Sequence, residues 1–334
     1  MANNNLPTLS AHLASLLGES RNQLRESVIP TLLHSIEDIA TTLRSTQQVS
    51  HVGSANTFGD AQLNLDLSTD AIIRTAIQKC PSIITASSEE NPVEKAVHDV
   101  PPTQTASSGE TYTLAFDPLD GSSIIPANWT VGTILGLWDG STALHQPPAE
   151  RQIAAILGVL GPRTTAFVAL NVPGCPKTCF EVGLADAEPK VLRTNVSLAP
   201  VSEIKTRYFA PANLRAAAQD ARYMALISRF IEQRYTLRYC GGLVPDVVHA
   251  LVKGHGVYVS PTTAASPAKL RRLYELVPIA LVMECAGGRA VDASTGEDVL
   301  GKEIGDVDER GGLVCGTASE VEDVVKDLGL SGKQ

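Results

Sequence analysis

Residues 114–123, which run LAFDPLDGSS, constrain the fold of this chain most. Larger apolar residues alternate with smaller ones from Tyr112 to Phe116, which predicts a strand with one buried face. Pro118 has no backbone N–H and fixes φ, so we expect regular pairing to end with Asp117 at the carboxyl end of this strand. The stretch therefore predicts a strand that stops at a proline and turns.

The turn itself carries the chemistry of a ligand site. Asp117 and Asp120 are three residues apart on a stiff turn, so both carboxylates can face one cation. Gly121 allows the backbone to approach a ligand closely, and N–H groups followed by Ser122 and Ser123 can face phosphate oxygens. A bare pair of aspartates at this spacing is most often solvated surface. The apolar strand before it and the Gly-Ser-Ser after it favour a site for a divalent metal and a phosphate ester.

Composition excludes several other classes of protein. The 334 residues allow two domains or one large one, and 43% of them are hydrophobic. The net charge is −9 and no block of Lys and Arg occurs, so we expect no nucleic-acid partner. No uninterrupted apolar run reaches the ~18 residues of a membrane span, so we expect no membrane partner. The six cysteines are scattered, which indicates a reducing compartment and a cytoplasmic location.

The hydrophobic pattern predicts a layered α/β protein. Residues 8–44 have apolar side chains at helical spacing, and Pro30 should mark a kink or a break. Strands are expected at 82–86, 112–117, 131–138, 153–160, 165–170, 208–210, 257–259 and 312–315. Helices are expected at 223–231, 245–253, 269–286 and 321–328.

One region lacks a regular pattern. Residues 171–206 are polar, and we expect them to be irregular. We place a domain boundary near residue 195. This divides the chain into an N-terminal domain, 1–195, which contains the predicted metal and phosphate site, and a C-terminal domain, 196–334.

Four further acidic residues lie beside predicted elements. Asp60 and Asp66 precede an expected helix, where either could simply begin the helix. Glu89 and Glu90 follow the strand at 82–86, which repeats the arrangement at Asp117. A solvated turn is the alternative for this second pair, so the residues alone leave both roles open.

Four segments in this order, 59–66, 88–90, 116–123 and 269–275, resemble a known class of enzymes. The class is the Mg²⁺-dependent sugar bisphosphatases, which includes fructose-1,6-bisphosphatase and sedoheptulose-1,7-bisphosphatase. The resemblance covers roughly residues 50–320. It implies an α-β-α-β-α sugar phosphatase fold, with a mixed sheet and helices in the N-terminal part and an α/β domain in the C-terminal part.

The resemblance also implies how the acidic residues act. Two or three Mg²⁺ ions, which Mn²⁺ can replace, would be held by oxygen ligands, as hard cations prefer. The implied metal ligands are Glu89, Asp117, the Leu119 carbonyl, Asp120 and Glu275, with Asp60 and Glu90 at a more weakly held position. Asp66 beside Glu90 resembles the pair that orients and deprotonates the attacking water, which makes Asp66, Glu90 and Asp60 the candidate catalytic residues.

Substrate-binding residues are implied in the same way. Gly121, Ser122 and Ser123 would hold the phosphate that is cleaved. The residues implied for the second phosphate and the sugar are Asn213, Arg238, Tyr239, Gly241, Gly242, Leu243, Lys269 and Arg271. In relatives the equivalent of Arg238 reaches across a subunit boundary, so a homo-oligomer, dimer or tetramer, is implied.

Within this class, five segments resemble the sedoheptulose branch: 58–60, 128–134, 161–165, 213–215 and 235–246. Ala216 and Ser260 stand where tyrosines surround the second phosphate in fructose bisphosphatases, so a roomier pocket is expected. The leading hypothesis is hydrolysis of the 1-phosphate of sedoheptulose 1,7-bisphosphate to sedoheptulose 7-phosphate. The alternatives are a fructose-1,6-bisphosphatase, an enzyme that accepts both sugars and, remotely, a non-catalytic sugar-phosphate sensor.

Overall fold

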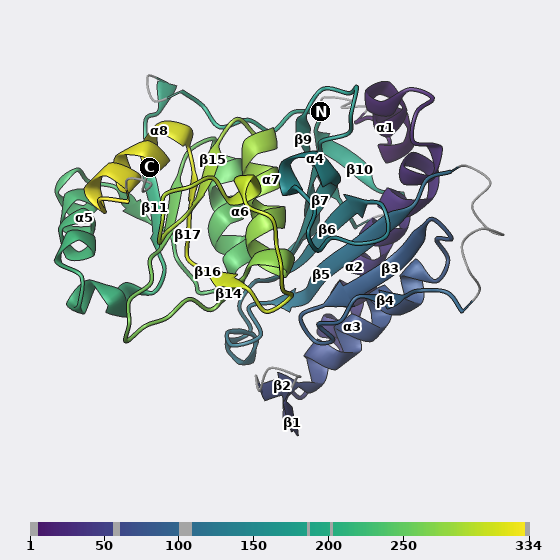
Figure 1. Cartoon of the computed structure of the whole chain (residues 1–334), viewed down its shortest axis with the longest axis horizontal. Coiled ribbons are helices and arrows are strands. Elements are labelled where there is room, and N and C mark those ends of the chain that lie inside the picture. The colour runs from purple at the N-terminus through teal and green to yellow at the C-terminus, as the bar shows by residue number, and fades with distance from the viewer. Residues whose placement is uncertain (1–5, 56–60, 100–108, 186–187, 201–202, 331–334) are drawn as a thin grey trace.

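Two β-sheets alternate with three layers of helices, in the order α-β-α-β-α (Figure 1). The structure is a computed structural model, and it describes residues 6–55, 61–99, 109–185, 188–200 and 203–330. The predicted layered α/β fold is confirmed. Asp60 lies outside the described residues.

The first helical layer contains α1 (Leu9–Leu17), α2 (Ile29–Ser45) and α3 (Asn64–Ile77). A π-helical turn, Leu24–Val28, leads directly into α2, and Pro30 is the second residue of that helix. The helical backbone continues through this junction, because Val28 and Ile29 have helical φ and ψ and the Ile29 N–H donates to the Leu24 carbonyl. The expected break at Pro30 is therefore wrong, and the irregularity is the π-helical turn just before the proline.

The larger sheet has eight strands in the order β10-β9-β8-β7-β6-β5-β3-β4. Only the β3–β5 pair is parallel. The strands are β3 (Ile83–Ser88), β4 (Lys95–Ala96), β5 (Tyr112–Asp120), β6 (Val131–Asp139), β7 (Gln152–Leu160), β8 (Thr164–Leu170), β9 (Thr178–Gly183) and β10 (Lys190–Arg193). The prediction that 171–206 is irregular is wrong, because short strands near a sheet edge carry little apolar alternation.

β5 differs from its prediction in two ways. All nine of its residues are buried, because helices cover both faces of the sheet, so the prediction of one buried face is wrong. Pairing also continues past Asp117, since Asp117 lies opposite Ile134 and Asp120 lies opposite Gly132. Three steps along β5 thus match two along β6. Pro118 is accommodated in this bulge and does not end the strand.

The middle layer consists of α6 (Leu243–Lys253) and α7 (Val277–Cys285), which pack between the two sheets. The first seven residues of α7 are all buried, as a helix enclosed on all sides requires. The predicted α-helix at 269–286 is wrong before Val277. That segment forms β14 (Leu270–Arg271) and a π-helical turn, Arg272–Leu276, before α7 begins.

The second sheet has the order β12-β11-β13-β17-β15, in which β12, β11 and β13 are parallel. Its strands are β11 (Tyr208–Pro211), β12 (Thr236–Leu237), β13 (Val257–Ser260), β15 (Arg289–Asp292) and β17 (Leu313–Gly316). Helices α5 (Ala221–Glu232) and α8 (Ala318–Asp327) form the last layer. The shorter elements are β1 (His51–Ala55), β2 (Ala61–Leu63), α4 (Pro148–Arg151), β16 (Arg310–Gly311) and 3₁₀ turns at Ile125–Ala127, Leu214–Ala218 and Val299–Gly301.

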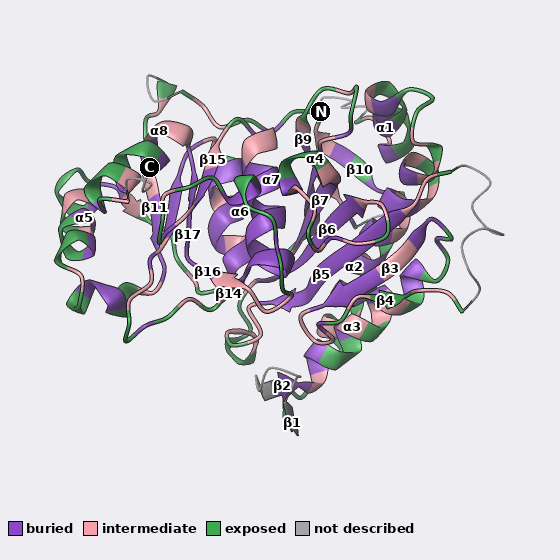
Figure 2. Cartoon of the chain, viewed as in Figure 1, coloured by how far each residue is buried: buried purple, intermediate pink, exposed green. Residues whose placement is uncertain are grey.

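Three hydrophobic clusters fill the spaces between the layers (Figure 2). One joins the first helices to the large sheet, one surrounds α6 and α7, and one joins the second sheet to α5 and α8. In the described part of the chain, no helix is long and apolar enough to cross a membrane. Because α6 and α7 pack on both sheets, the two halves share the central cluster, and the boundary near 195 stays a prediction.

Gly132 provides a test of how α6 is seated. A Cβ at this position would lie 2.4 Å from the Val244 Cβ, so we expect Gly132→Ala to push the first turn of α6 away from β6. Overpacking of this kind costs about 1–3 kcal/mol. Thermal and urea unfolding measure the loss. Gly301→Ala is the matched control, because a Cβ there meets open space. Equal stability of the two variants would contradict the close packing.

Candidate active site

Three buried carboxylates meet at the bulge of β5. One oxygen of each of Asp117, Asp120 and Glu275 lies within 4.8 Å of the other two. Their exposed fractions are 4%, 6% and 7%. The bulge brings Asp117 and Asp120 together from one strand, and the π-helical turn before α7 supplies Glu275. Residues separated by about half of the chain therefore form one acidic cluster.

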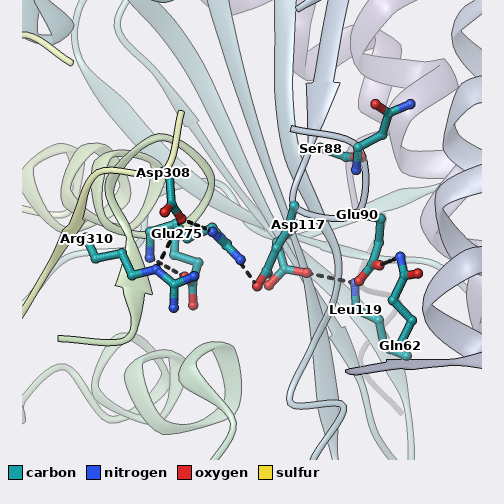
Figure 3. A network of polar contacts seen from close by, with 11 residues as sticks. Gln62, Ser88, Glu90, Asp117, Leu119, Glu275, Asp308 and Arg310 are labelled. Carbon is teal, nitrogen blue, oxygen red and sulfur yellow. Dashed lines mark hydrogen bonds and ion pairs between the residues drawn. The ribbon is translucent and has the colours of Figure 1, made fainter. Parts of the chain in front are cut away.

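This cluster forms part of the wall of a cavity of about 190 Å³. In the view of Figure 3, Asp117 lies between Glu275 and Glu90. The residues that line the cavity are Glu89, Asp117, Leu119, Asp120, Gly121, Ser122, Ser123, Gly241, Leu243, Tyr258, Leu270 and Glu275. Acidic groups thus share one hollow with the small-residue turn that the sequence predicts to bind phosphate.

Asp120 is held by the N-terminus of α6. Its two oxygens accept the N–H groups of Leu243 (2.9 Å) and Val244 (2.6 Å). These N–H groups have no partner within the helix, and the positive end of the helix dipole favours a carboxylate. Each oxygen keeps a further lone pair that a cation can use.

Arg271 is buried inside the acidic region and not exposed to the cavity as a clamp. Its exposed fraction is 1%, and its side chain donates to Glu89 (3.2 Å) and to Asp308. Its backbone N–H donates to Glu275 Oε2 (2.5 Å). Arg271 therefore orients two of the candidate metal ligands. The family resemblance implied a substrate-binding role for Arg271, and no pattern in the sequence pointed to Asp308, which lies in a polar segment.

Glu90 and Asp66 do not line the cavity, but both interact electrostatically with Glu89, which does. Glu90 accepts a hydrogen bond from the Gln62 amide (Figure 3). Asp66 lies in the first turn of α3 and accepts the Leu63 N–H (2.8 Å), so it also caps the helix. The Asp66 charge acts on Glu90, and the Glu89 charge acts on both. The alternative role of Asp66 as a helix-start residue is thus compatible with a place near Glu89 and Glu90.

Burial and mutual repulsion raise the pKa values of five carboxyl groups in this region. Burial, followed by the Glu89 charge, raises the pKa values of Asp117 and Glu275 well above their usual range. Burial raises the pKa of Asp120 to about 7 even though two N–H groups oppose the rise. It raises the pKa of Asp66 to about 6 and that of Glu90 to about 7. Raised values of this kind are typical of functional sites.

These residues fit a divalent cation. The donors are all carboxylate oxygens, which hard cations prefer, and no histidine or cysteine lines the cavity in the described part of the chain. Several buried carboxylates cannot all ionise in a small hollow unless a positive charge lies among them. Asp117, Asp120 and Glu275 are the residues best placed to hold it, with Glu89 beside them.

Close backbone packing shapes the phosphate end of the cavity. Gly121 has φ +88°, and a Cβ on it would lie 3.3 Å from the Gly242 Cα. Glycine therefore allows the turn after β5 to touch the loop before α6. Ser122, Ser123, Gly241 and the Leu243 backbone surround the same space, while Gly242 forms the contact behind it.

Asp246 holds this loop from the other side and had no role in the sequence analysis. It is buried, and its oxygens accept the N–H groups of Cys240 (2.7 Å) and Gly241 (2.9 Å). Asp120 and Asp246 together fix four backbone N–H groups between 240 and 244. The signal for Asp246 was its place in the 235–246 motif.

None of the residues expected at the second phosphate lines this cavity. Arg238 is exposed and lies over the Tyr208 ring, 5.7 Å from its centre. Tyr239 is 47% exposed, and Lys269 is exposed directly before Leu270 of the cavity wall. The Asn213 amide donates to the carbonyls of Pro261 (2.8 Å) and Ser266 (3.4 Å), so its hydrogens are used within the protein.

Ala216 does not create the roomier pocket that the sequence led us to expect. This residue is fully buried in the hydrophobic cluster beneath α5, so its small side chain leaves no space at the cavity. Ser260 is half-buried at the end of β13. A small residue in an aligned position indicates space only where its side chain faces the ligand.

Two known protein-domain families match most of this chain. The fructose-1-6-bisphosphatase N-terminal domain family matches residues 15–183, and the C-terminal domain family matches residues 203–328. The chain belongs to the fructose-1,6-bisphosphatase family. The resemblance predicted from four short segments is thereby confirmed.

Relatives in the fructose-1,6-bisphosphatase family carry two names. A chloroplastic sedoheptulose-1,7-bisphosphatase of Triticum aestivum is 36% identical over 266 residues, 80% of this chain and 63% of that protein. A class 1 fructose-1,6-bisphosphatase of Syntrophotalea carbinolica is 33% identical over 303 residues, 87% of each chain. A Toxoplasma gondii structure provisionally named a sedoheptulose-1,7 bisphosphatase superposes with a TM-score of 0.84 at 35% identity, covering 97% of this chain and 99% of that one. The chain spans less than two thirds of the plant relatives that it matches.

We expect a divalent cation to stabilise this protein more near pH 8 than near pH 5.5. Unfolded carboxyls titrate at about pH 4, whereas Asp120 and Glu90 have folded pKa values of about 7. The folded chain thus binds more protons between these values, and its stability falls as pH rises through them. A cation offsets this loss only where the cluster is ionised. The melting temperature with and without magnesium chloride, at both pH values, measures the difference; an equal shift at both would contradict it.

Proposed function

We propose that this protein is a sugar bisphosphatase that hydrolyses the 1-phosphate of sedoheptulose 1,7-bisphosphate to sedoheptulose 7-phosphate and phosphate. The observation that carries the proposal is the meeting of buried carboxylates and a Gly-Ser-Ser turn in one cavity of a fructose-1,6-bisphosphatase family member. Fructose 1,6-bisphosphate is the second candidate substrate, because relatives with that name match at 33% identity.

The acidic cluster would hold Mg²⁺. Asp117, Asp120 and Glu275 are the central ligands, joined by Glu89, the Leu119 carbonyl and, at a weaker position, Asp60 and Glu90. When bound, the cations would activate water and neutralise charge on the leaving oxygen and the phosphate. Arg271 and the N-terminus of α6 would keep Glu89 and Asp120 in orientation as charge moves.

Asp66 and Glu90 are proposed to orient the attacking water and to accept its proton. Their pKa values of about 6 and about 7 allow one of them to be ionised while the other holds a proton near neutrality. A general base works best when its pKa lies near the working pH. Asp60 would assist them from the segment before β2.

The two ends of the substrate would be bound differently. The turn at Gly121, Ser122 and Ser123 would hold the phosphate that is cleaved through N–H and hydroxyl groups, with Gly241, Gly242 and Leu243 along the sugar. Lys269 and Tyr239 would contact the second phosphate. Asn213 would act by tying its loop to residues 261–266.

We further propose that a second copy of this chain covers a large apolar groove. The groove is about 850 Å³ and lies between α2, the β7–β8 turn and α6. Trp129, Val49 and Val252 line it with exposed fractions of 54%, 36% and 49%. His249 also lines it and packs on Tyr208, over which Arg238 lies. Arg238 therefore adjoins the groove, and it would serve the second phosphate in the partner's cavity.

We infer a cytoplasmic location for the enzyme. All six cysteines are free thiols, and three of them are buried in the core. A chain kept in this state suits a reducing compartment.

The proposed activity is tested by phosphate release from a panel of sugar bisphosphates, with and without Mg²⁺. Asp117→Asn should lower kcat on the order of 10³-fold with little change in KM, because it removes charge that acts in the transition state. Asp38→Asn, at an exposed position of α2, is the control and should match the wild type. Undiminished release after chelation, or a variant that changes only KM, would contradict the proposal.

The oligomer is tested by analytical ultracentrifugation of Val252→Glu, which should sediment as a smaller species than the wild type. Arg238→Ala should mainly raise KM. Mixing its subunits with inactive Asp117→Asn subunits should restore part of the wild-type KM, because intact Arg238 would then face intact acidic clusters. If mixing restores nothing, Arg238 acts within its own chain or not at all.

A further inference from the structure

The carboxyl ends of three parallel strands meet on the cavity side of the second sheet. β12, β11 and β13 are adjacent and run in the same direction. Tyr258 of β13 lines the cavity, and the segments after β11 and β12 carry Arg215 and Tyr239. Because ligands bind at the carboxyl ends of parallel strands, these segments are placed to reach a substrate.

Electrostatic interactions link Tyr258, Tyr239 and Arg215. Burial raises the pKa of Tyr258, and the nearby Tyr239 phenol raises it further. Burial also raises the pKa of Tyr239, whereas the Arg215 guanidinium lowers it. Tyr239 is thus a neighbour of both the cavity wall and Arg215.

The backbone around Arg215 is held firmly. Asn213 has φ 48°, and its amide joins this loop to residues 261–266, which lead to Lys269. In the 3₁₀ turn Leu214–Ala218, Ala216 and Ala217 are buried while Leu214 and Arg215 are exposed. The turn is anchored by its alanines and presents Arg215 outward.

Arg215 differs from three other arginines of the C-terminal half. Arg207, Arg222 and Arg229 each have a carboxylate partner, Glu320, Asp220 and Asp327 respectively. Within the described residues, the Arg215 guanidinium forms no hydrogen bond or ion pair. An exposed guanidinium left in this state is available for a bidentate contact with phosphate.

We propose that Arg215 binds the second phosphate of the substrate from within the same chain, which makes it a specificity-determining residue for bisphosphates over monophosphates. The inference rests on the proposed function and assigns a residue that the sequence analysis left without a role. It complements Arg238, whose guanidinium lies over Tyr208 beside the groove.

The test compares Arg215→Ala, Arg215→Lys and the control Arg222→Ala, whose side chain is 60% exposed on α5. For the bisphosphate that the wild type hydrolyses faster, Arg215→Ala should raise KM roughly tenfold or more with kcat changed by less than about twofold. The KM of Arg215→Lys should lie between those of the wild type and Arg215→Ala, because lysine keeps a point charge. The KM of Arg222→Ala should match that of the wild type. For fructose 1-phosphate, which lacks the second phosphate, kcat/KM should be the same in all four proteins.

Calorimetric binding of sedoheptulose 7-phosphate gives a readout that does not depend on activity. Arg215→Ala should weaken this binding by about the same factor as it raises KM. The inference is overturned if Arg215→Ala leaves KM and binding unchanged, or if it changes the monophosphate and the bisphosphate equally. A wild type that releases no phosphate from any bisphosphate refutes the proposed function, and the calorimetry then still decides the role of Arg215.

Discussion

The hydrogen bonds from Leu243 and Val244 to Asp120 hold the site together. Asp120 belongs to the large sheet, and the two N–H groups belong to the helix that separates the sheets. A carboxylate at the positive end of a helix is stabilised by the unpaired N–H groups and the dipole. Gly132 permits this approach because any Cβ there would overlap Val244. The cavity exists where these elements meet.

The acidic cluster destabilises the folded protein when its carboxylates are ionised without a counter-charge. Burial and like charge raise the pKa values of Asp117, Asp120 and Glu275, so their ionised forms are disfavoured without a counter-charge. Arg271 supplies part of that charge through Glu89, and Asp308 holds Arg271 in turn. A site arranged in this way is ready for a cation, which is consistent with the proposed phosphatase chemistry.

Much of the fold could be predicted from pattern, since long apolar strands such as β6, β7 and β8 were found nearly to their ends. The failures have two causes. β10 is a short edge strand with β9 next to it, and Leu270–Leu276 follows tertiary contacts in place of helical spacing. For the site, the sequence found the acidic residues but gave no sign that Arg271 is buried among them.

The sequence by itself determined the local chemistry. A strand followed by Asp-Pro-Leu-Asp-Gly-Ser-Ser places oxygen donors and small residues within one turn, and that requires only neighbouring residues. Only the tertiary structure decided that Glu275 joins this turn, that Asn213 uses its amide inside the protein, and that Arg215 remains unpaired. Those outcomes depend on which segments, distant in the sequence, pack together. The helices between the two sheets set this packing, and the sequence neighbours of each residue do not.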